Sequence, residues 1–144
     1  MIGLTLETRP DYIDEKEILN FRKLGCTRVE LGVQSIFDDV LQKNNRGHDV
    51  AETIRATKLL KDAGFKINYH MMPGLFGSSL KKDLLMFQKL FSNGDFQPDM
   101  LKIYPTVVTK GSVLYKLWRK GRYESLNDKQ FAKFIVQIKN KIAS

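Results

Sequence analysis

Cysteine is nearly absent from this sequence of 144 residues, which contains only one, Cys26. A single thiol cannot form an internal disulfide and cannot supply the several ligands of a metal cluster. The surrounding residues, LGCTRVEL, predict a turn from a helix into a buried strand, where a thiol acts as a small apolar side chain. We therefore expect a structural role for Cys26 and no metal site in this chain.

Long apolar runs are missing as well, because no stretch approaches the roughly 20 residues that cross a bilayer. The first residues, MIGLTLETRPDY, contain no basic stretch before an apolar one and no small-residue cleavage site. We expect no signal peptide, no membrane partner and a cytoplasmic location. The composition, with 42% hydrophobic and 28% charged residues, is typical of one globular domain. A domain of this length buries about 70% of the surface of its unfolded chain.

Acidic residues are in short supply relative to basic ones. The 16 Asp and Glu residues face 24 Lys and Arg residues, which gives a formal charge of +8 and a pI of about 9.6. A surplus of this kind raises the local concentration of anionic partners through long-range attraction. Nucleic acid is the leading candidate, and the alternative is a basic domain whose charge serves only solubility.

Strand-like and helix-like segments alternate along the chain about four times. Apolar and β-branched runs predict strands at 2–7, 28–33 and 66–72, and a fourth that ends near Pro105. Helix caps are predicted at Asp14, at Asp49 and at residue 78 or 79. Parallel strands need a crossover connection, which helices provide, so the pattern predicts an α/β fold. Either an open doubly wound sheet or half of a (β/α)8-type barrel fits this pattern.

Apolar spacing also predicts which helix residues face the core. The residues expected there are Ile18, Phe21 and Leu24 in the first long helix, Leu80, Leu84, Phe87 and Phe91 in the helix after the third strand, and Phe131, Phe134, Ile135, Ile138 and Ile142 in the last.

Ligands of parallel sheets bind at the carboxyl ends of the strands. Glu7 ends the first predicted strand, where it would accept hydrogen bonds from an amine or from ribose hydroxyls, or form a salt bridge with Arg9. Gln34 ends the second, where its amide would bind a sugar or base edge, or satisfy loop backbone. Arg46, in KNNRGHD, has the shape to hold a carboxylate or phosphate, or is an ordinary exposed arginine. The residues alone leave these alternatives open.

The segment PGLFGSS, residues 73–79, has two glycines before a helix and loosely resembles a phosphate-binding loop. It lacks the lysine of a Walker loop and the spacing of GxGxxG. His48 and His70 have no Cys or Asp companions at metal-binding spacing, so they indicate no metal site.

Four segments together resemble a known family: LTLETRPDYID, LGCTRVELGVQSIFDDVL, NRGHDVAETIRATKLLKDAGFKINYHMMPGLFGS and DMLKIYPTVVTKGSVLYKLWRKGRY. They resemble the radical S-adenosylmethionine (SAM) domain of the Elongator catalytic subunit family, enzymes that modify the wobble uridine of tRNA. The resemblance covers about residues 2 to 123. It implies a partial (β/α) TIM-like barrel with outer helices, in which the four strands are the third to sixth. Residues 1–144 would form its C-terminal part, with 124–144 as a terminal helix of undetermined packing.

The resemblance also implies roles for residues at the strand ends. Glu7 and Arg46 would hold the amino and carboxylate groups of the methionine of SAM, and Gln34 would reach its ribose. The glycine loop would let the backbone at Gly74 approach the cofactor. The family's MPGLPG is MPGLFG here, so Phe76 stands where the family has a proline.

The family binds a 4Fe-4S cluster through three cysteines of an earlier loop and uses acetyl-coenzyme A in a further domain. With these it places a carboxymethyl precursor on C5 of the wobble uridine. This sequence begins after that loop and contains neither part, so we expect a fragment that is inactive alone and carries a partial SAM site. The rest of the barrel, or other Elongator-like subunits, would be its protein partners. An uncovered inner sheet face would favour self-association.

Nucleic-acid contacts are predicted around the last strand and its following helix. Tyr104, Tyr115 and Trp118 are interleaved there with basic residues and would stack on bases, although we expect Trp118 itself in the core. Two further interpretations stay open: a stand-alone basic RNA-binding or scaffold module without chemistry, and a complete small α/β protein with another nucleotide ligand. The basic residues are Lys102, Lys110, Lys116, Arg119, Lys120 and Arg122.

Overall fold

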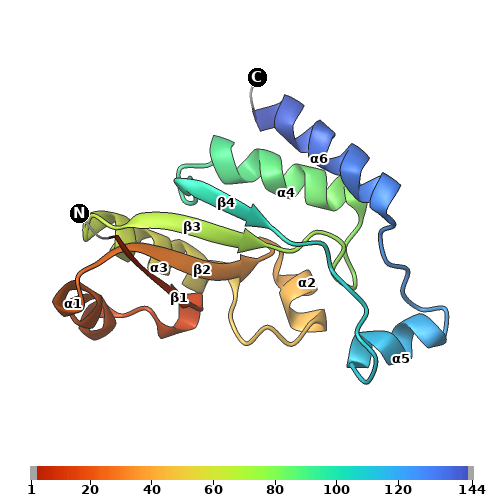
Figure 1. Cartoon of the computed structure of the whole chain (residues 1–144), viewed down its shortest axis with the longest axis horizontal. Coiled ribbons are helices and arrows are strands. Elements are labelled where there is room, and N and C mark those ends of the chain that lie inside the picture. The colour runs from red at the N-terminus through yellow and green to blue at the C-terminus, as the bar shows by residue number, and fades with distance from the viewer. Residues whose placement is uncertain (1–2, 143–144) are drawn as a thin grey trace.

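The structure is a computed structural model that describes residues 3–142. Four parallel strands lie side by side in the order β1-β2-β3-β4, with helices between consecutive strands (Figure 1). The strands are β1 (Leu4–Thr8), β2 (Cys26–Gln34), β3 (Lys66–Met71) and β4 (Met100–Ile103). The helices are the 3-10 turn η1 (Pro10–Tyr12) and the α-helices α1 (Glu15–Lys23), α2 (Asp38–Lys43), α3 (Val50–Asp62), α4 (Leu80–Ser92), α5 (Val113–Arg119) and α6 (Asp128–Ile142).

One face of the sheet forms the hydrophobic core. Successive side chains of a strand point to opposite faces, so Val29 and Leu31 of β2 and Ile67 of β3 share one face. All three are fully buried, in one cluster with residues of α1, α3, α4 and α6. Figure 1 shows α3 behind the sheet, α1 at the lower left, and none of the described helices in front of β1, β2 and β3. The sheet is therefore covered on one side, which confirms the predicted partial barrel and excludes the doubly wound arrangement.

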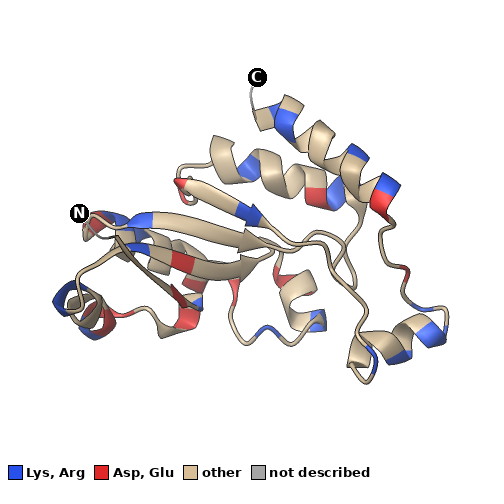
Figure 2. Ribbon diagram, in the orientation of Figure 1, with Lys and Arg blue, Asp and Glu red and all other residues tan. Residues whose placement is uncertain are grey.

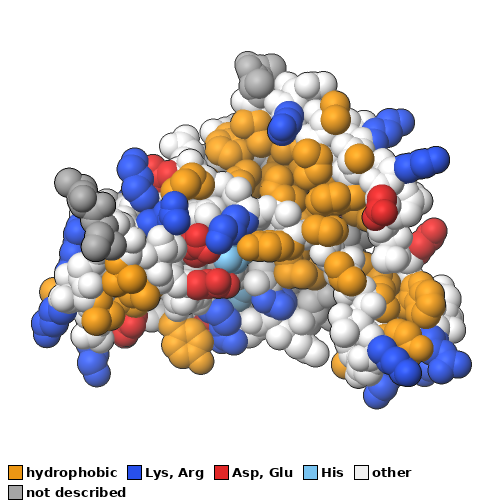
Figure 3. All heavy atoms as spheres, in the orientation of Figure 1, with side chains coloured by type: hydrophobic (Ala, Val, Ile, Leu, Met, Phe, Trp, Pro, Cys, Tyr) orange, Lys and Arg blue, Asp and Glu red, His pale blue; other side chains and the backbone are white. Residues whose placement is uncertain are grey.

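The uncovered face carries polar residues at the alternate positions. The register aligns Glu7 with Glu30, Glu30 with Asn68, and, two residues further along the strands, His70 with Lys102, so the four strands bring these side chains together on one face of the sheet. Figure 3 shows acidic and histidine side chains over the middle of this face. It also shows hydrophobic side chains gathered over β4, α4 and α6, along the edge that β4 forms. Self-association through such surface remains a prediction.

The predicted helix caps are confirmed. The Asp14 carboxylate accepts a hydrogen bond from the backbone N–H of Glu17, and Ser79 caps α4 by accepting from Lys82. Asp49 and Glu52 form a complete capping box at the start of α3. Such caps satisfy backbone donors that the first helical turn leaves free, which is why they are readable from sequence.

Each of the three predicted buried faces is partly wrong, that of the last helix at Ile142, which is exposed. Leu24 follows the last residue of α1 and its side chain is 63% exposed. In α4 the buried apolar residues are Met86, Phe87 and Leu90, whereas Leu80 is 38% exposed and lies at the first helical position. The actual face of α4 is rotated relative to the predicted one because α4 packs against α6 as well as the sheet core.

The C-terminal helix packs on α4, where the Phe134 and Phe87 rings meet edge to face with centroids 5.9 Å apart. Phe134 and Ile138 are buried, Phe131 and Ile135 are partly buried, and Ile142 is exposed. Figure 1 shows α6 lying beside α4, away from the open sheet face. Within residues 3–142 no helix combines the length and hydropathy needed to cross a bilayer.

Candidate functional site

Gln34 ends β2 in an unusual backbone conformation. Its φ is 67°, in the left-handed region that non-glycine residues seldom occupy, and the pairing with β3 shifts register just before it. The neighbouring Gly32 makes room for the side chain, because a Cβ there would lie 3.2 Å from Gln34 Nε2. The amide Oε1 is buried and accepts no hydrogen bond from the described part of the chain. A buried acceptor without a partner is costly, so this atom is free for a ligand.

Arg46 lies in the loop between α2 and α3. Its side chain is half-buried, and Nε is buried without a hydrogen-bond partner among residues 3–142. Burial lowers the pKa of Arg46, and the positive charge of Arg9 lowers it further. A partly desolvated guanidinium beside a second cation favours an anionic ligand.

The Arg46 loop also contacts the ends of β1 and β2. His48 Nε2 lies 3.1 Å from the carbonyl oxygen of Val33 in β2. A Cβ added at Gly47 would lie 3.3 Å from the guanidinium of Arg9, which directly follows β1. Arg46 is thereby held at the same edge of the sheet as Gln34, which the sequence prediction required.

Glu7 lies at the end of β1, and its side chain is 66% exposed. Its Oε1 is 3.3 Å from Nδ1 of His70 in β3. The predicted alternative, a salt bridge with Arg9, does not form, because Arg9 pairs with Asp11. One side of the Glu7 carboxylate is therefore oriented by the protein while the rest faces solvent.

Glu30, which the sequence analysis did not single out, is the centre of this polar cluster on the open face. Its Oε2 is 2.7 Å from His70 Nε2 and 2.6 Å from Lys102 Nζ, and its Oε1 accepts from Asn68 at 3.3 Å. Burial raises the pKa of Glu30, but the hydrogen bonds and charges of Lys102 and His70 outweigh it, and the net shift is downward. Together with Glu7 this network takes a side chain from each of the four strands. Glu30 could have been noticed in the sequence, because it is a carboxylate between Val29 and Leu31 in a strand that was predicted to be buried.

The network is also a conceivable metal-ligand set. Glu7, Glu30 and His70 each offer a ligand atom within 4.8 Å of one another. The Lys102 ammonium already contacts Glu30, however, and a cation there would compete with it directly. The geometry is that of an ion-pair network, and we assign no metal to it.

The glycine loop is fixed by residues of this chain. Gly74 has a φ of 81°, its N–H donates to Asp83 at 2.8 Å, and its carbonyl accepts from the Tyr123 hydroxyl at 2.7 Å. A Cβ at Gly74 would meet Leu126 at 3.3 Å. Gly74 thus allows the segment before α6 to approach the loop closely. The predicted contact of Gly74 with the cofactor stays a prediction. Phe76 packs against Tyr123, with ring centroids 6.4 Å apart.

The predicted nucleic-acid residues divide into two places. Lys102 is in β4, paired with Glu30 on the open face. The other residues lie in or beside α5, where Figure 2 shows several basic residues along the ribbon, and they are exposed. These are Lys110, Arg119, Lys120 and Arg122. Trp118 in the same helix is 47% exposed, so its predicted place in the core is wrong.

Comparison with known families agrees with this geometry. Residues 1–87 match the model of the radical SAM superfamily, and residues 98–144 match that of the Radical_SAM C-terminal domain. The one-sided parallel sheet with polar residues at its carboxyl edge is thus that of a radical SAM barrel, and the chain belongs to the radical SAM superfamily.

Within the superfamily the chain is related to the Elongator catalytic subunit, as predicted. It is 50% identical to the tRNA uridine(34) acetyltransferase of Methanocaldococcus infernus over 139 residues, 96% of this chain and 26% of that protein. It is 44% identical to Elongator complex protein 3 of Homo sapiens over 137 residues, 95% of this chain and 25% of the relative. The chain therefore spans about a quarter of the length of these curated relatives.

Solved structures extend the comparison. The structure of M. infernus Elp3 with an N-terminal deletion matches with a TM-score of 0.91 and 50% identity, over 95% of this chain and 32% of that one. Coproporphyrinogen III oxidase of Escherichia coli, a radical SAM enzyme, matches with a TM-score of 0.70 at 16% identity, over 96% of this chain and 32% of that one. At that identity the second match shows the fold alone.

Proposed function

We infer that this chain forms the SAM-binding part of the barrel of a radical SAM enzyme that modifies a tRNA uridine. The observation that carries the proposal is the pair of buried, unpartnered polar atoms, Gln34 Oε1 and Arg46 Nε, at the edge of the sheet where Glu7 presents its carboxylate. The name of the relative with 50% identity supports the substrate class.

The residues present fit the polar groups of SAM. Glu7 would bind the methionine ammonium, because His70 orients one carboxylate oxygen and solvent reaches the rest. Arg46 would bind the methionine carboxylate through charge-assisted hydrogen bonds, and the Gln34 amide would bind a ribose hydroxyl. SAM supplies the radical chemistry of the superfamily when it is bound, and these residues hold and orient it.

The residues present do not fit a 4Fe-4S cluster. Such a cluster needs several thiolates, and the one cysteine is buried at the first residue of β2, the end of the strand opposite to Gln34. We derive no step through the cluster. Its ligands, and any site for acetyl-coenzyme A, would have to come from outside these 144 residues.

The formal charge of +8 and the cations around α5 support a polyanionic partner, which we propose to be tRNA in the cytoplasm. The same cations favour the second candidate, a basic RNA-binding module without chemistry. That candidate predicts RNA affinity and no affinity for SAM.

Equilibrium binding of SAM to the 144-residue protein separates the candidates. Glu7→Ala or Arg46→Ala should weaken SAM binding about 10-fold or more, because each removes a charge-assisted hydrogen bond. Matched controls are Glu15→Ala and Lys129→Ala, exposed residues of α1 and α6, which should leave the affinity unchanged. RNA binding without SAM binding at millimolar concentration, or equal effects of control and site variants, would contradict the proposed cofactor role.

A further inference from the structure

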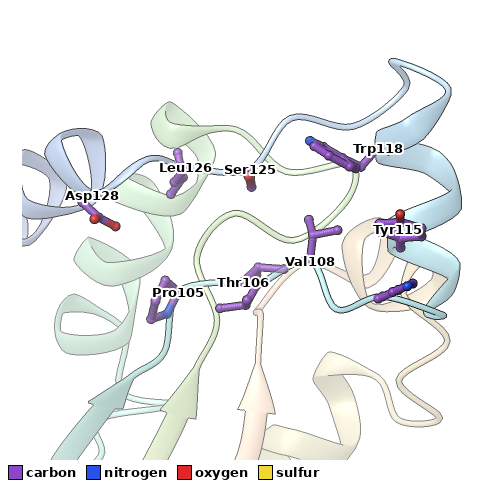
Figure 4. A pocket seen from close by; sticks show the side chains of 10 residues that line it. Pro105, Thr106, Val108, Tyr115, Trp118, Ser125, Leu126 and Asp128 are labelled. Atoms are coloured by element: carbon purple, nitrogen blue, oxygen red, sulfur yellow. The ribbon is translucent and has the colours of Figure 1, made fainter.

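A pocket of about 460 Å³ lies beyond the end of β4, between α5 and the start of α6. Figure 4 shows its construction: Pro105, Thr106 and Val108 of the connection after β4 line the pocket between two walls. One wall is formed by the Tyr115 and Trp118 rings of α5, and the other by the segment 125–128. The pocket is on the carboxyl side of the sheet and is separate from Glu7, Gln34 and Arg46, none of which lines it.

The aromatic wall, formed by Tyr115 and Trp118, is not part of the hydrophobic core. No residue of α5 is buried, and the helix is capped by the Ser112 hydroxyl, which accepts from the backbone N–H of Tyr115 at 3.0 Å. The Tyr115 and Trp118 rings pair with centroids 5.7 Å apart and planes inclined by 31°. Trp118 remains 47% exposed. Two large rings held together beside an open pocket form a surface on which a flat ligand stacks.

The surface around α5, beside this pocket, is basic and favours an anionic ligand. Lys110 lines the pocket, and α5 has no acidic residue in its first turn. Among residues 3–142 none of the cations around α5 forms an ion pair with a carboxylate. On the opposite wall, Ser125 and the Asp128 carboxylate offer hydrogen-bonding groups for the edge of a ligand. These cations are Lys110, Lys116, Arg119, Lys120 and Arg122.

We propose that this pocket binds one unpaired nucleobase of an RNA. The base stacks on the Trp118–Tyr115 pair, and the cations around α5 bind the flanking phosphates. A stacking surface needs a free base face, so a single-stranded loop fits and a closed duplex does not. A polypeptide segment would fill the apolar part of the pocket but would leave the unpaired cations without partners. The inference rests on the RNA part of the proposed function and adds where and how the RNA is bound.

The single tryptophan of the sequence makes a direct test available, because all indole fluorescence of the protein comes from Trp118. The probes are a short hairpin RNA with an unpaired loop and a duplex of the same stem without a loop. Titration with the hairpin should quench Trp118 fluorescence to saturation, whereas the duplex should bind more weakly and leave the fluorescence nearly unchanged. Acrylamide quenching of the free protein should be efficient, as an uncovered indole requires.

Variants separate stacking from charge. Trp118→Ala should weaken hairpin binding about 10-fold or more, measured by fluorescence anisotropy of labelled RNA, and leave its salt dependence unchanged. Trp118→Phe keeps a stackable ring and should retain most of the affinity. Lys120→Ala should reduce the slope of log affinity against log salt by about 1 for hairpin and duplex alike. The matched control is Tyr12→Ala, an aromatic that is 63% exposed in η1 and should not change RNA affinity.

Three outcomes would contradict the assignment of this pocket as a nucleobase site. The first is saturating hairpin binding without a change in Trp118 fluorescence, and the second is an equal loss of RNA affinity in Trp118→Ala and Tyr12→Ala. The third is an indole that a bound polypeptide or a second copy shields from acrylamide. In each of these cases tRNA could still be the substrate. Absence of any RNA binding by the wild-type protein would overturn the pocket and the RNA part of the proposed function together. SAM affinity, measured on the same variants, should not change in any of them.

Discussion

Glu30 of β2 and His70 of β3 share a hydrogen bond of 2.7 Å between Oε2 and Nε2, and the other ring nitrogen of His70 faces Glu7. Glu30 is thus one side chain away from the carboxylate that we assign to the methionine ammonium. Because Lys102 holds the same Glu30 oxygen from β4, the carboxylate connects three strands on the open face of the sheet.

Glu30→Gln should lower the free energy of unfolding by about 1–3 kcal/mol, because the neutral amide loses the charge that strengthens the contacts with His70 and Lys102 and replaces one of the two acceptor oxygens by an NH2 donor. Urea unfolding followed by circular dichroism measures this. Glu15→Gln, at an exposed position of α1, is the matched control and should change stability by less than about 0.5 kcal/mol. Equal stability of the two variants would show that Glu30 contributes nothing net to the fold.

The same carboxylate should make stability depend on pH. The pKa of Glu30 is lowered below its ordinary value of 4.5, so its stabilising contribution is fully present above that value and is lost as the pH falls through the folded-state pKa. The difference in unfolding free energy between wild type and Glu30→Gln should therefore be constant near neutral pH and shrink below about pH 4.5. If the difference in unfolding free energy between wild type and Glu30→Gln grew at acidic pH, the lowered pKa of Glu30 would be contradicted.

Asp83 should be needed for the glycine loop. It is buried in α4, and its carboxylate accepts from the N–H of Gly74 and from the Ser78 hydroxyl. Asp83→Ala leaves both donors without this partner and should reduce the free energy of unfolding by about 1–3 kcal/mol. Asp95→Ala, in the exposed turn after α4, is the control. Hydrogen exchange should show faster exchange at the Gly74 amide in the Asp83 variant only.

Glycine at position 77 should be required for its backbone. Its φ is 84°, and an added Cβ would lie 2.5 Å from Lys43 Cδ, the movable part of a long side chain. The main penalty of Gly77→Ala is therefore the left-handed conformation, about 1–2 kcal/mol. Gly94→Ala is the matched control, since its φ is outside that region and no atom lies within 4 Å of the added Cβ. The midpoint of thermal unfolding should fall in Gly77→Ala and stay near that of the wild type in Gly94→Ala.

The sequence could predict what depends on near neighbours along the chain. Asp14, Asp49 and Ser79 cap helices through residues three positions away, and the alternation of β2 is visible in RVELGV. The contacts of Glu30 could not be predicted in this way, because His70 and Lys102 are 40 and 72 residues distant and meet it only through the register of three strands.

The same distinction explains the errors at the candidate sites. One of the two alternatives for Glu7, a salt bridge with Arg9, was a local contact, but Arg9 pairs with Asp11 and Glu7 with His70 across the sheet. Trp118 was expected in the core, yet α5 is a short helix with no buried residue. How much of a side chain is covered depends on which segments pack over it, and local spacing does not contain that information.

The left-handed backbone of Gln34 implies a compromise between folding and binding. Glycine adopts this conformation without the Cβ penalty, so Gln34→Gly should raise the free energy of unfolding by up to about 1 kcal/mol, measured in urea. Selection for folding stability alone would favour glycine at this position. If Gln34→Gly is more stable but binds SAM more weakly, the native chain gives up folding stability in order to orient the Gln34 amide toward the ligand. The end of β2 would then be a poor target for mutations meant to raise thermal stability.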